Sequence, residues 1–395
     1  MTSSSNRKRK ILILSSYTLP DTAGSGIHAF RFARFINRIG DKATILTFNR
    51  NCRLPNRETI ENVPVFRIPY FNKGLVMKIL SLPIVTYYYI LFILKNEIVF
   101  IYGGRIIAWE LFILFSKLFH KKVVFRSLLT GVDDMKKMLI DRPFLVKNVS
   151  KALIKRIDCY YSINKYFTEQ YLNIFHTRRN ILEIPQGVDR QEFFPVTEMR
   201  KIELRKQFGL PEDSLILISA GLLIRRKGYI ELFRQLTKLS FEYKYIVLGD
   251  HEIPENHFLS GFDSETFEIL NLGKNLLKDR ITFLGFRKNI AEYLQCSDLM
   301  LINSYREGLP NVLLEAMACG IPVITRNLEG LDNFVIRNNI NSLIYNKEEE
   351  IPGLVSHLYY SKKIVEKLTF NAIKDIESKY SFEKIYSLLH RRIFN

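Results

Sequence analysis

Short apolar runs alternate with amphipathic helical periods along the chain, and this alternation, which occurs twice, constrains the fold most. In the first half, the runs predict strands at 11–15, 43–47, 63–68, 98–102, 123–126, 159–163 and 181–184, with helices at 27–39, 109–119 and 165–175. The pattern restarts with strands at 214–220, 245–248, 281–284, 299–302 and 322–325, and a helix from about Gly228. Runs without polar residues are typical of strands covered on both sides of a parallel sheet. The sequence therefore predicts an α/β chain with two doubly wound, Rossmann-like domains.

The domain division is expected near residues 186–196, which contain Gly187 and Pro195 and have no regular period. A length of 395 residues exceeds what one ordinary core needs, so two domains are expected, at 1–188 and 189–379. Open α/β sheets bind ligands outside the carboxyl ends of their strands. Two such sheets facing each other across a cleft would therefore place the ligand in that cleft.

Positive charge is concentrated in the first half of the chain. The net charge is +18, and residues 1–190 contain 31 Lys and Arg against 13 Asp and Glu, whereas the remainder contains 27 of each sign. Such a one-sided excess indicates an anionic surface facing the first domain, either nucleic acid or anionic lipid.

Residues 75–94 form a long apolar segment that allows three interpretations. Its length permits a membrane span, but Lys78, Pro83 and the mid-segment tyrosines Tyr87, Tyr88 and Tyr89 argue against one. The alternatives are a helix lying in the membrane surface and a helix packed on the domain core.

Several absences narrow the functional class and the location. The four cysteines are scattered and form no C-x-x-C pair, which indicates a reducing compartment and no zinc site. The first apolar run is too short for a cleaved leader, so a cytoplasmic location is expected. The sequence contains no D-x-D triplet, which would indicate a metal-bound diphosphate. It also contains no P-loop and no G-x-G-x-x-G motif, which would indicate ATP hydrolysis and a dinucleotide cofactor. We therefore expect neither a metal nor a cofactor.

The strongest local signal lies at residues 304–324, SYREGLPNVLLEAMACGIPVI. A strand ends at a loop containing Glu307, and a helix is expected to begin near Pro310 or Asn311, directing its N-terminal partial charge at a ligand. Glu315 follows eight residues after Glu307, about one turn into that helix. Two carboxylates placed in this way can accept hydrogen bonds from the diols of a sugar and a ribose.

This stretch resembles the E-x7-E motif of family-4 glycosyltransferases, which have the GT-B fold. The resemblance implies that Glu307 contacts the transferred sugar and that Glu315 holds the nucleotide ribose. It also implies that the backbone amides of Gly308, Leu309 and Asn311 reach the sugar and phosphate.

Other segments resemble the same family in order and spacing. They are 184–189 (IPQGVD), 219–228 (SAGLLIRRKG), 246–250 (IVLGD), 281–285 (ITFLG) and 380–389. The resemblance places Gly285 beside the donor nucleotide, and it implies that a helix at about 380–395 packs back onto the first domain.

The basic run Arg225, Arg226 and Lys227 has two interpretations. It can clamp the donor diphosphate, with arginine binding two oxygens and lysine acting as a point charge, or it can be a solvated loop. The clamp is favoured because the run joins a buried strand to a helix. Relatives often carry an arginine where this chain has Leu222, and Arg226 is the expected substitute.

A glycine-rich segment, PDTAGSGIH at 20–28, follows the first strand. Gly24 and Gly26 can let the backbone approach a donor phosphate, or they can form only a turn. The resemblance favours the first alternative. His28 is expected to be structural rather than catalytic.

The segment 125–134 lacks the histidine that many relatives carry near the reacting sugar. Arg126, Asp133 and Asp134 follow a strand there. They can orient the acceptor, or they can cap the next secondary-structure element, and the sequence leaves both alternatives open.

The resemblance implies a retaining glycosyltransferase, and the lack of a D-x-D triplet indicates that it is metal-independent. It would bind a nucleotide-sugar donor on its second domain and a saccharide or polyprenyl-linked acceptor on its first. By analogy with the family, the expected role is assembly of a bacterial surface polysaccharide. The basic first half adds an expected location at the inner face of the cytoplasmic membrane, against anionic lipid. A nucleotide-sugar epimerase of the same fold is the alternative. A nucleic-acid-binding protein is a more distant one, because the basic residues form no recognisable nucleic-acid motif.

Overall fold

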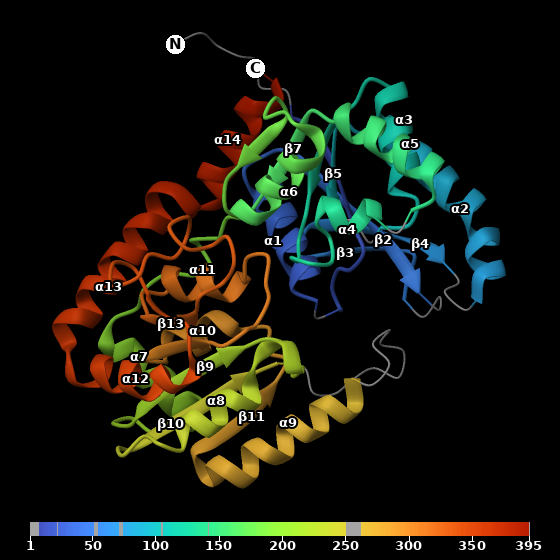
Figure 1. Ribbon diagram of the computed structural model, residues 1–395. Helices are drawn as coiled ribbons and strands as arrows, with labels where there is room; N and C mark the ends of the chain where they lie inside the picture. Colours follow the sequence, from blue (N-terminus) through green and yellow to red (C-terminus); the bar gives the residue numbers. More distant parts are fainter. Residues whose placement is uncertain are drawn as a thin grey trace, which may run out of the picture. The chain divides into compact units, whose positions relative to one another are not determined.

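The computed structural model describes residues 8–21, 23–50, 54–70, 74–103, 106–140, 142–249 and 262–394 (Figure 1). The chain divides into an N-terminal unit, Met1–Ile184 with Tyr386–Asn395, and a C-terminal unit, Pro185–Ile385. The division falls four residues before the predicted one. Val188 explains the difference, because its N–H donates to the Tyr380 carbonyl at 2.9 Å and its carbonyl accepts from the Phe382 N–H at 3.0 Å.

The N-terminal unit is built on an eight-stranded sheet. Its strands are β1 (Lys10–Ser15), β2 (Lys42–Arg50), β3 (Arg57–Ile60), β4 (Val63–Tyr70), β5 (Ile98–Tyr102), β6 (Lys122–Arg126), β7 (Cys159–Ser162) and β8 (Ile181–Glu183). Their order is β3-β4-β2-β1-β5-β6-β7-β8, with β3 antiparallel to β4 and every other pair parallel. All seven strands predicted in this half are confirmed, whereas the edge strand β3 was not predicted.

Helices cover both faces of this sheet. They are α1 (Gly24–Arg38), α2 (Gly74–Lys95), α3 (Trp109–Leu118), α4 (Met135–Ile140), α5 (Phe144–Lys155) and α6 (Lys165–Phe175), joined by the last part of α14 (Phe382–Phe394). Tyr386 of α14 packs its ring against Phe32 and Phe35 of α1, with centroids 6.2 Å apart in each pair. Its hydroxyl also donates to the Asp41 carboxylate at 2.5 Å. These contacts fix the end of the chain on the α1 side of the sheet.

The C-terminal unit has a six-stranded, all-parallel sheet. Its strands are β9 (Leu215–Ala220), β10 (Tyr243–Leu248), β11 (Ile281–Gly285), β12 (Leu299–Ile302), β13 (Val323–Arg326) and β14 (Leu343–Tyr345). Their order is β11-β10-β9-β12-β13-β14. This is the doubly wound Rossmann order, in which the direction of winding reverses between the first and the fourth strand of the unit, here β9 and β12.

The helices of this unit alternate with its strands. They are α7 (Glu198–Gln207), α8 (Tyr229–Leu236), α9 (Phe262–Leu277), α10 (Ile290–Gln295), α11 (Asn311–Ala318), α12 (Ile351–Tyr360) and α13 (Lys362–Asp375), with short turns η1 (Arg225–Lys227), η2 (Lys278–Arg280) and η3 (Glu348–Glu350). A π-helical segment, Ile376–Tyr380, continues α13. The two predicted Rossmann-like α/β domains are thus confirmed.

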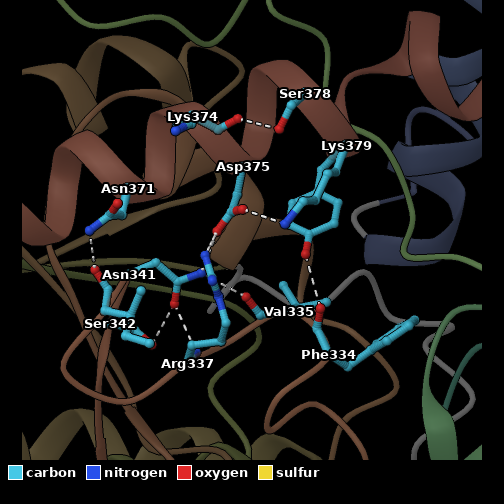
Figure 2. Close-up of polar contacts among 12 residues, drawn as sticks. Phe334, Val335, Arg337, Asn341, Ser342, Asn371, Lys374, Asp375, Ser378 and Lys379 are labelled. Carbon is cyan, nitrogen blue, oxygen red and sulfur yellow. Dashed lines mark hydrogen bonds and ion pairs between the residues drawn. The ribbon is translucent and has the colours of Figure 1, made fainter.

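A buried carboxylate ties α13 to the loop that precedes β14 (Figure 2). The Asp375 carboxylate accepts hydrogen bonds from Asn341 at 2.9 Å, from Lys379 at 2.8 Å and from the Arg337 guanidinium. Burial acts to raise the pKa of Asp375, but the bonds from Lys379, Asn341 and Arg337 outweigh it and lower this pKa. The cluster therefore stabilises the carboxylate form.

The long apolar segment predicted at 75–94 is helix α2, and one of its faces packs on the core. Ser81, Val85, Tyr89 and Ile93 are buried along that face, at the spacing of a helical stripe. The Tyr89 hydroxyl donates to the Ile107 carbonyl at 2.6 Å. No helix in the described part of the chain is both long and apolar enough to cross a membrane.

Candidate donor site in the C-terminal unit

The candidate site lies where the C-terminal sheet reverses its winding. Strands β9 and β12 are neighbours there, and their carboxyl ends open onto the same edge of the sheet. The turn η1 follows β9, and the loop that carries Glu307 follows β12. Two segments about 80 residues apart in sequence are therefore brought together at the position where doubly wound sheets bind ligands.

A carboxylate with two cations forms the centre of this site. Glu307 Oε1 lies 2.7 Å from the Lys227 ammonium nitrogen and 2.9 Å from a guanidinium nitrogen of Arg226. The Glu307 side chain is only 10% exposed, so the three charges interact in a partly desolvated environment. Arg226 also donates to the Arg306 carbonyl at 2.5 Å, which attaches the turn η1 to the Glu307 loop.

Opposing effects act on the pKa of Glu307. Burial acts to raise it, but the charges of Lys227 and Arg226, with hydrogen bonds from Lys227 and Ser304, lower it below its usual value. Glu307 is consequently a carboxylate at neutral pH. It can accept hydrogen bonds from hydroxyl groups, while the two cations can bind an anion.

Asn303 and Gly228 hold the two segments in register. The Asn303 side-chain amide donates to the Gly228 carbonyl at 2.7 Å, and Asn303 also accepts from the Tyr345 hydroxyl at 2.6 Å. Gly228 has a φ of +65°, and a Cβ placed on it would lie 2.3 Å from the Asn303 carbonyl oxygen. Only glycine therefore fits between the basic turn and β12 without a backbone shift.

Glycines also lie at the carboxyl ends of β9, β10 and β11, the three strands on one side of β12. Gly221, Gly249 and Gly285 follow or close β9, β10 and β11. A Cβ on Gly249 would lie 2.0 Å from the Gly221 carbonyl oxygen, and a Cβ on Gly221 would lie 3.0 Å from Lys227 Cε. The edge predicted to lie beside the nucleotide is thus bare backbone, on which the Lys227 side chain lies. Asp250, in the same predicted motif, lies outside the described residues.

Gln186 supports the loop between Glu307 and α11. Its buried side-chain amide donates to the Leu309 carbonyl at 2.9 Å and to the Asn311 side-chain oxygen at 2.7 Å. Gly308 and Leu309 are buried, and α11 begins at Asn311 with Pro310 as its N-cap. This arrangement directs the positive end of the α11 dipole toward the loop.

Glu315 lies within α11, at its fifth residue, and is 5% exposed. The expected placement, about one turn into a helix, is correct. The structure therefore puts both carboxylates of the motif on adjoining parts of the same loop–helix segment.

Arg225 is separated from its two neighbours in the basic run. Its side chain is 67% exposed and pairs with Glu268 of α9 at 2.8 Å. Of the three predicted cations, Arg226 and Lys227 contact Glu307.

Sequence reasoning did not single out Gln186, Asn303 or Gly228 as site residues. Asn303 was detectable, because a polar residue directly after a buried strand lies at the ligand-binding edge of such a sheet. The role of Gln186 depends on a contact across more than 120 residues and has no local sequence signal.

The candidate residues of the first domain lie in the N-terminal unit, around its own reversal of winding between β1 and β5. Arg126 is 1% exposed, and its guanidinium lies 4.9 Å from the ring centre of Tyr102 and 5.4 Å from that of Tyr161. It also lies 3.1 Å from Nδ1 of His28. Because a guanidinium has no acceptor, Nδ1 of His28 accepts this bond and the ring proton is carried by Nε2. His28 is thus buried against Arg126.

The neighbouring acidic pair is also buried. Asp134 accepts a hydrogen bond from the Lys137 N–H at 2.8 Å, so it caps helix α4. Capping is one of the two roles that the sequence left open for this residue. Asp133 is 6% exposed.

Gly24 and Gly26 lie in the first turn of α1, which begins three residues earlier than predicted. A Cβ on Gly26 would lie 2.8 Å from backbone atoms of Tyr17. Close packing of the helix on the preceding loop thus accounts for this glycine without a ligand.

The architecture described above, with two Rossmann-like α/β units, is the GT-B fold. The structure of Anabaena HepE, solved in complex with UDP and glucose, matches it with a TM-score of 0.76 at 17% identity, over 97% of this chain and 98% of that one. This likeness concerns the fold.

The family is identified from the sequence of the C-terminal unit. Residues 200–375 match the family model "Glycosyl transferases group 1", and this segment, which contains Arg226, Lys227, Glu307 and Glu315, belongs to that family.

Two curated relatives each match about half of the chain. One is N-acetyl-alpha-D-glucosaminyl L-malate synthase of Bacillus anthracis, 28% identical over 48% of this chain and 47% of the relative. The other is UDP-Gal:alpha-D-GlcNAc-diphosphoundecaprenol alpha-1,3-galactosyltransferase of Escherichia coli, 28% identical over 49% of this chain and 51% of the relative. The chain thus spans about half the length of these relatives.

Proposed function

We propose that the protein is a retaining glycosyltransferase that transfers a sugar from a nucleotide-sugar donor. The observation that carries the proposal is the contact of Glu307 with Lys227 and Arg226 at the reversal point of the C-terminal sheet, within the segment that belongs to the group 1 family. The two cations can bind the negatively charged diphosphate of a nucleotide sugar. The carboxylate beside them can accept hydrogen bonds from the hydroxyls of the attached sugar.

The reaction needs no protein nucleophile. The acceptor oxygen forms a bond to the anomeric carbon as the bond to the diphosphate breaks, on the same face of the sugar. The departing phosphate oxygen takes the acceptor proton. Lys227 and Arg226 neutralise the charge that develops on the diphosphate, and Glu307 orients the sugar. Glu315 holds the ribose, and the backbone of 308–311 contributes at the start of α11. Two side-chain cations supply the charge for which a divalent metal would otherwise be required.

The acceptor is proposed to be a saccharide linked to a polyprenyl lipid. The name of the Escherichia coli relative contains such a diphosphoundecaprenol acceptor. The excess of basic residues in the first half of the chain is suited to anionic headgroups and to a diphosphate-linked lipid. We therefore propose a peripheral location on the inner face of the cytoplasmic membrane and a role in surface polysaccharide assembly. In this proposal, Arg126 and Asp133 lie on the acceptor side, and Gly24 and Gly26 lie near the donor phosphate.

The test is release of nucleoside diphosphate from a panel of nucleotide sugars, with and without polyprenyl-diphosphate saccharides. Acceptor-dependent release with the donor's anomeric configuration kept in the product, as read by NMR, is the expected result. Inverted configuration would contradict the retaining mechanism. Conversion of one nucleotide sugar into another without acceptor would instead support the epimerase alternative.

A further inference from the structure

Exposed apolar side chains gather on one part of the N-terminal unit. Among the described residues, 24 large apolar side chains are exposed, and 13 of them lie between positions 76 and 149. They belong to α2, α3, α5 and the end of α4. Single exposed apolar residues are ordinary on a protein surface, but a concentration of this kind marks an interaction site.

Helix α5 carries the most exposed of them. Phe144 and Leu145 are 75% and 76% exposed at its first turn, and Val149 is 56% exposed one turn further on. The opposite face of α5 packs on the unit through Leu153 and Ile154, which are buried. The exposed residues are therefore not required for the core.

Helix α2 continues the exposed surface. Val76, Leu80, Ile84 and Tyr87 are 68%, 62%, 39% and 63% exposed, and they lie at the spacing of one helical stripe, opposite the buried stripe of Ser81, Val85 and Tyr89. Because this helix is apolar all round, packing on the sheet covers only half of its apolar surface.

The helices that bear these side chains lie on one side of the sheet. Right-handed crossovers place α2, α3 and α5 on the face opposite α1, because the chain moves through β4, β5, β6 and β7 in one direction and from β1 to β2 in the other. Helix α3 contacts both α2 and α5, and the three helices are grouped together in Figure 1. We call their outward side chains the apolar helix face.

The charge around this face is positive. The segment 142–157, which contains α5, has five Lys and Arg and no acidic residue. The whole N-terminal unit has 32 Lys and Arg against 12 Asp and Glu, a net charge of +20, whereas the C-terminal unit has a net charge of −2.

We propose that the apolar helix face, led by Phe144 and Leu145 of α5, docks the N-terminal unit on an anionic lipid bilayer. This proposal rests on the membrane location proposed above and names the surface that makes the contact. A helix with exposed apolar residues at one end and lysines along the rest binds a bilayer interface by inserting the former among the headgroups and pairing the latter with anionic lipid.

Charge favours the bilayer over a second copy of the chain as the occupant. Two copies joined through this face would bring two units of charge +20 together. An anionic surface is complementary to that charge, and it also accepts the apolar residues. The sequence pattern indicates only residues 75–94 as an apolar contact with the membrane, and α5 adds exposed apolar residues on the same helix as Lys147, Lys151 and Lys155.

The experiment is cosedimentation of the full chain with vesicles of neutral lipid alone or with about one third anionic lipid, at low and high salt. The test variant is Phe144→Ser with Leu145→Ser. Its matched control is Met199→Ser with Phe370→Ser, two residues of the C-terminal unit that are 72% and 67% exposed. Thermal unfolding checks that each variant is folded.

Wild type and the control are expected to bind anionic vesicles, and the test variant to bind them at least tenfold more weakly at both salt concentrations. Lys151→Gln with Lys155→Gln should weaken binding at low salt only, because charge is screened at high salt.

Equal binding by test variant and wild type would overturn this inference while leaving the membrane location standing. If wild type binds no vesicle, both fail. A dimer in solution that the test variant converts to monomer would assign the face to a second copy instead. Donor binding, measured on the same samples, tests the proposed enzyme separately.

Discussion

Glu307 lies 2.7 Å from the Lys227 ammonium group and, in the same structure, contacts Arg226. The carboxylate thus pairs with the same two cations that we propose to bind the donor diphosphate. An incoming diphosphate must compete for these contacts, and its binding would release Glu307 to face the sugar. The ion pair therefore keeps the cations neutralised and correctly placed while no donor is bound.

Replacing Glu307 by Gln removes this competition, so a nucleoside diphosphate without sugar should bind about tenfold more tightly, equivalent to about 1.4 kcal/mol. The same variant should lose transfer activity by about 100-fold or more, because the contact to the sugar is lost. Calorimetric titration of UDP and a transfer assay measure the two effects. Glu315→Gln is the matched control and should weaken UDP binding, because its proposed contact is to the ribose. Equal or weaker UDP binding by the Glu307 variant would show that the ion pair does not compete with the diphosphate.

Transfer activity is expected to survive EDTA, since Lys227 and Arg226 supply the positive charge at the diphosphate. Arg226→Gln should cost about 2–5 kcal/mol of transition-state stabilisation. Arg225→Gln is the control, because its side chain is exposed and pairs with Glu268 instead. Loss of activity in EDTA that magnesium or manganese restores would mean that a metal carries the charge.

Gly228→Ala should disrupt the basic turn. The new Cβ would lie 2.3 Å from the Asn303 carbonyl oxygen, so the backbone of η1 or β12 must move. Gly209 has nearly the same φ, +64° against +65°, but nothing lies within 4 Å of its Cβ position. Gly209→Ala therefore reports the cost of the left-handed conformation alone, about 1 kcal/mol. Thermal unfolding and UDP titration should show a larger loss of stability and weaker binding for Gly228→Ala only. Similar behaviour of the two variants would show that the close approach of Gly228 to Asn303 does not hold the basic turn in place.

Asp375→Asn should lower the free energy of unfolding by about 1–3 kcal/mol at pH 7, because three donors then bond to a neutral amide. The pKa of Asp375 is lowered on folding, so its stabilisation is present above the usual value near 3.8 and is lost as the pH falls below that value. The difference between variant and wild type should therefore shrink toward pH 3. Glu377→Gln is the control, since its pair with Arg190 is about half exposed and should contribute less than about 1 kcal/mol. A difference that does not change with pH would show that the charge of Asp375 is not responsible.

The sequence predicted the central strands of both sheets, because buried parallel strands are uninterrupted apolar runs. It did not predict β3, whose residues Arg57–Ile60 alternate between exposed and half-buried at the sheet edge, or β14, which has three residues. The edge strand β3 has no apolar run to detect. The resemblance assigned Glu307 and the basic run to the same donor, but it did not predict the contact between them. The separation of Arg225 from Lys227 depends on the turn geometry of η1 and could not be read from the letters RRK.

The buried polar contacts were the least predictable part. Gln186 and Asn303 act through partners that are distant in sequence, and the pairing of His28 with Arg126 joins positions 98 residues apart. A single sequence gives no signal for such contacts, although it placed Gln186, Asn303 and Arg126 near strand ends.

The central claim is that Lys227, with Arg226, binds the diphosphate of a nucleotide-sugar donor. Calorimetric titration of Lys227→Met and wild type with UDP and with uridine tests it most directly, because the two ligands differ only in the diphosphate. If a panel of nucleoside diphosphates shows that another base raises the Tm more, that base replaces uracil in both ligands. The predicted result is that UDP binds the variant at least tenfold more weakly while uridine binds both proteins equally. A loss of the same size for both ligands, or no loss for UDP, would contradict the assignment.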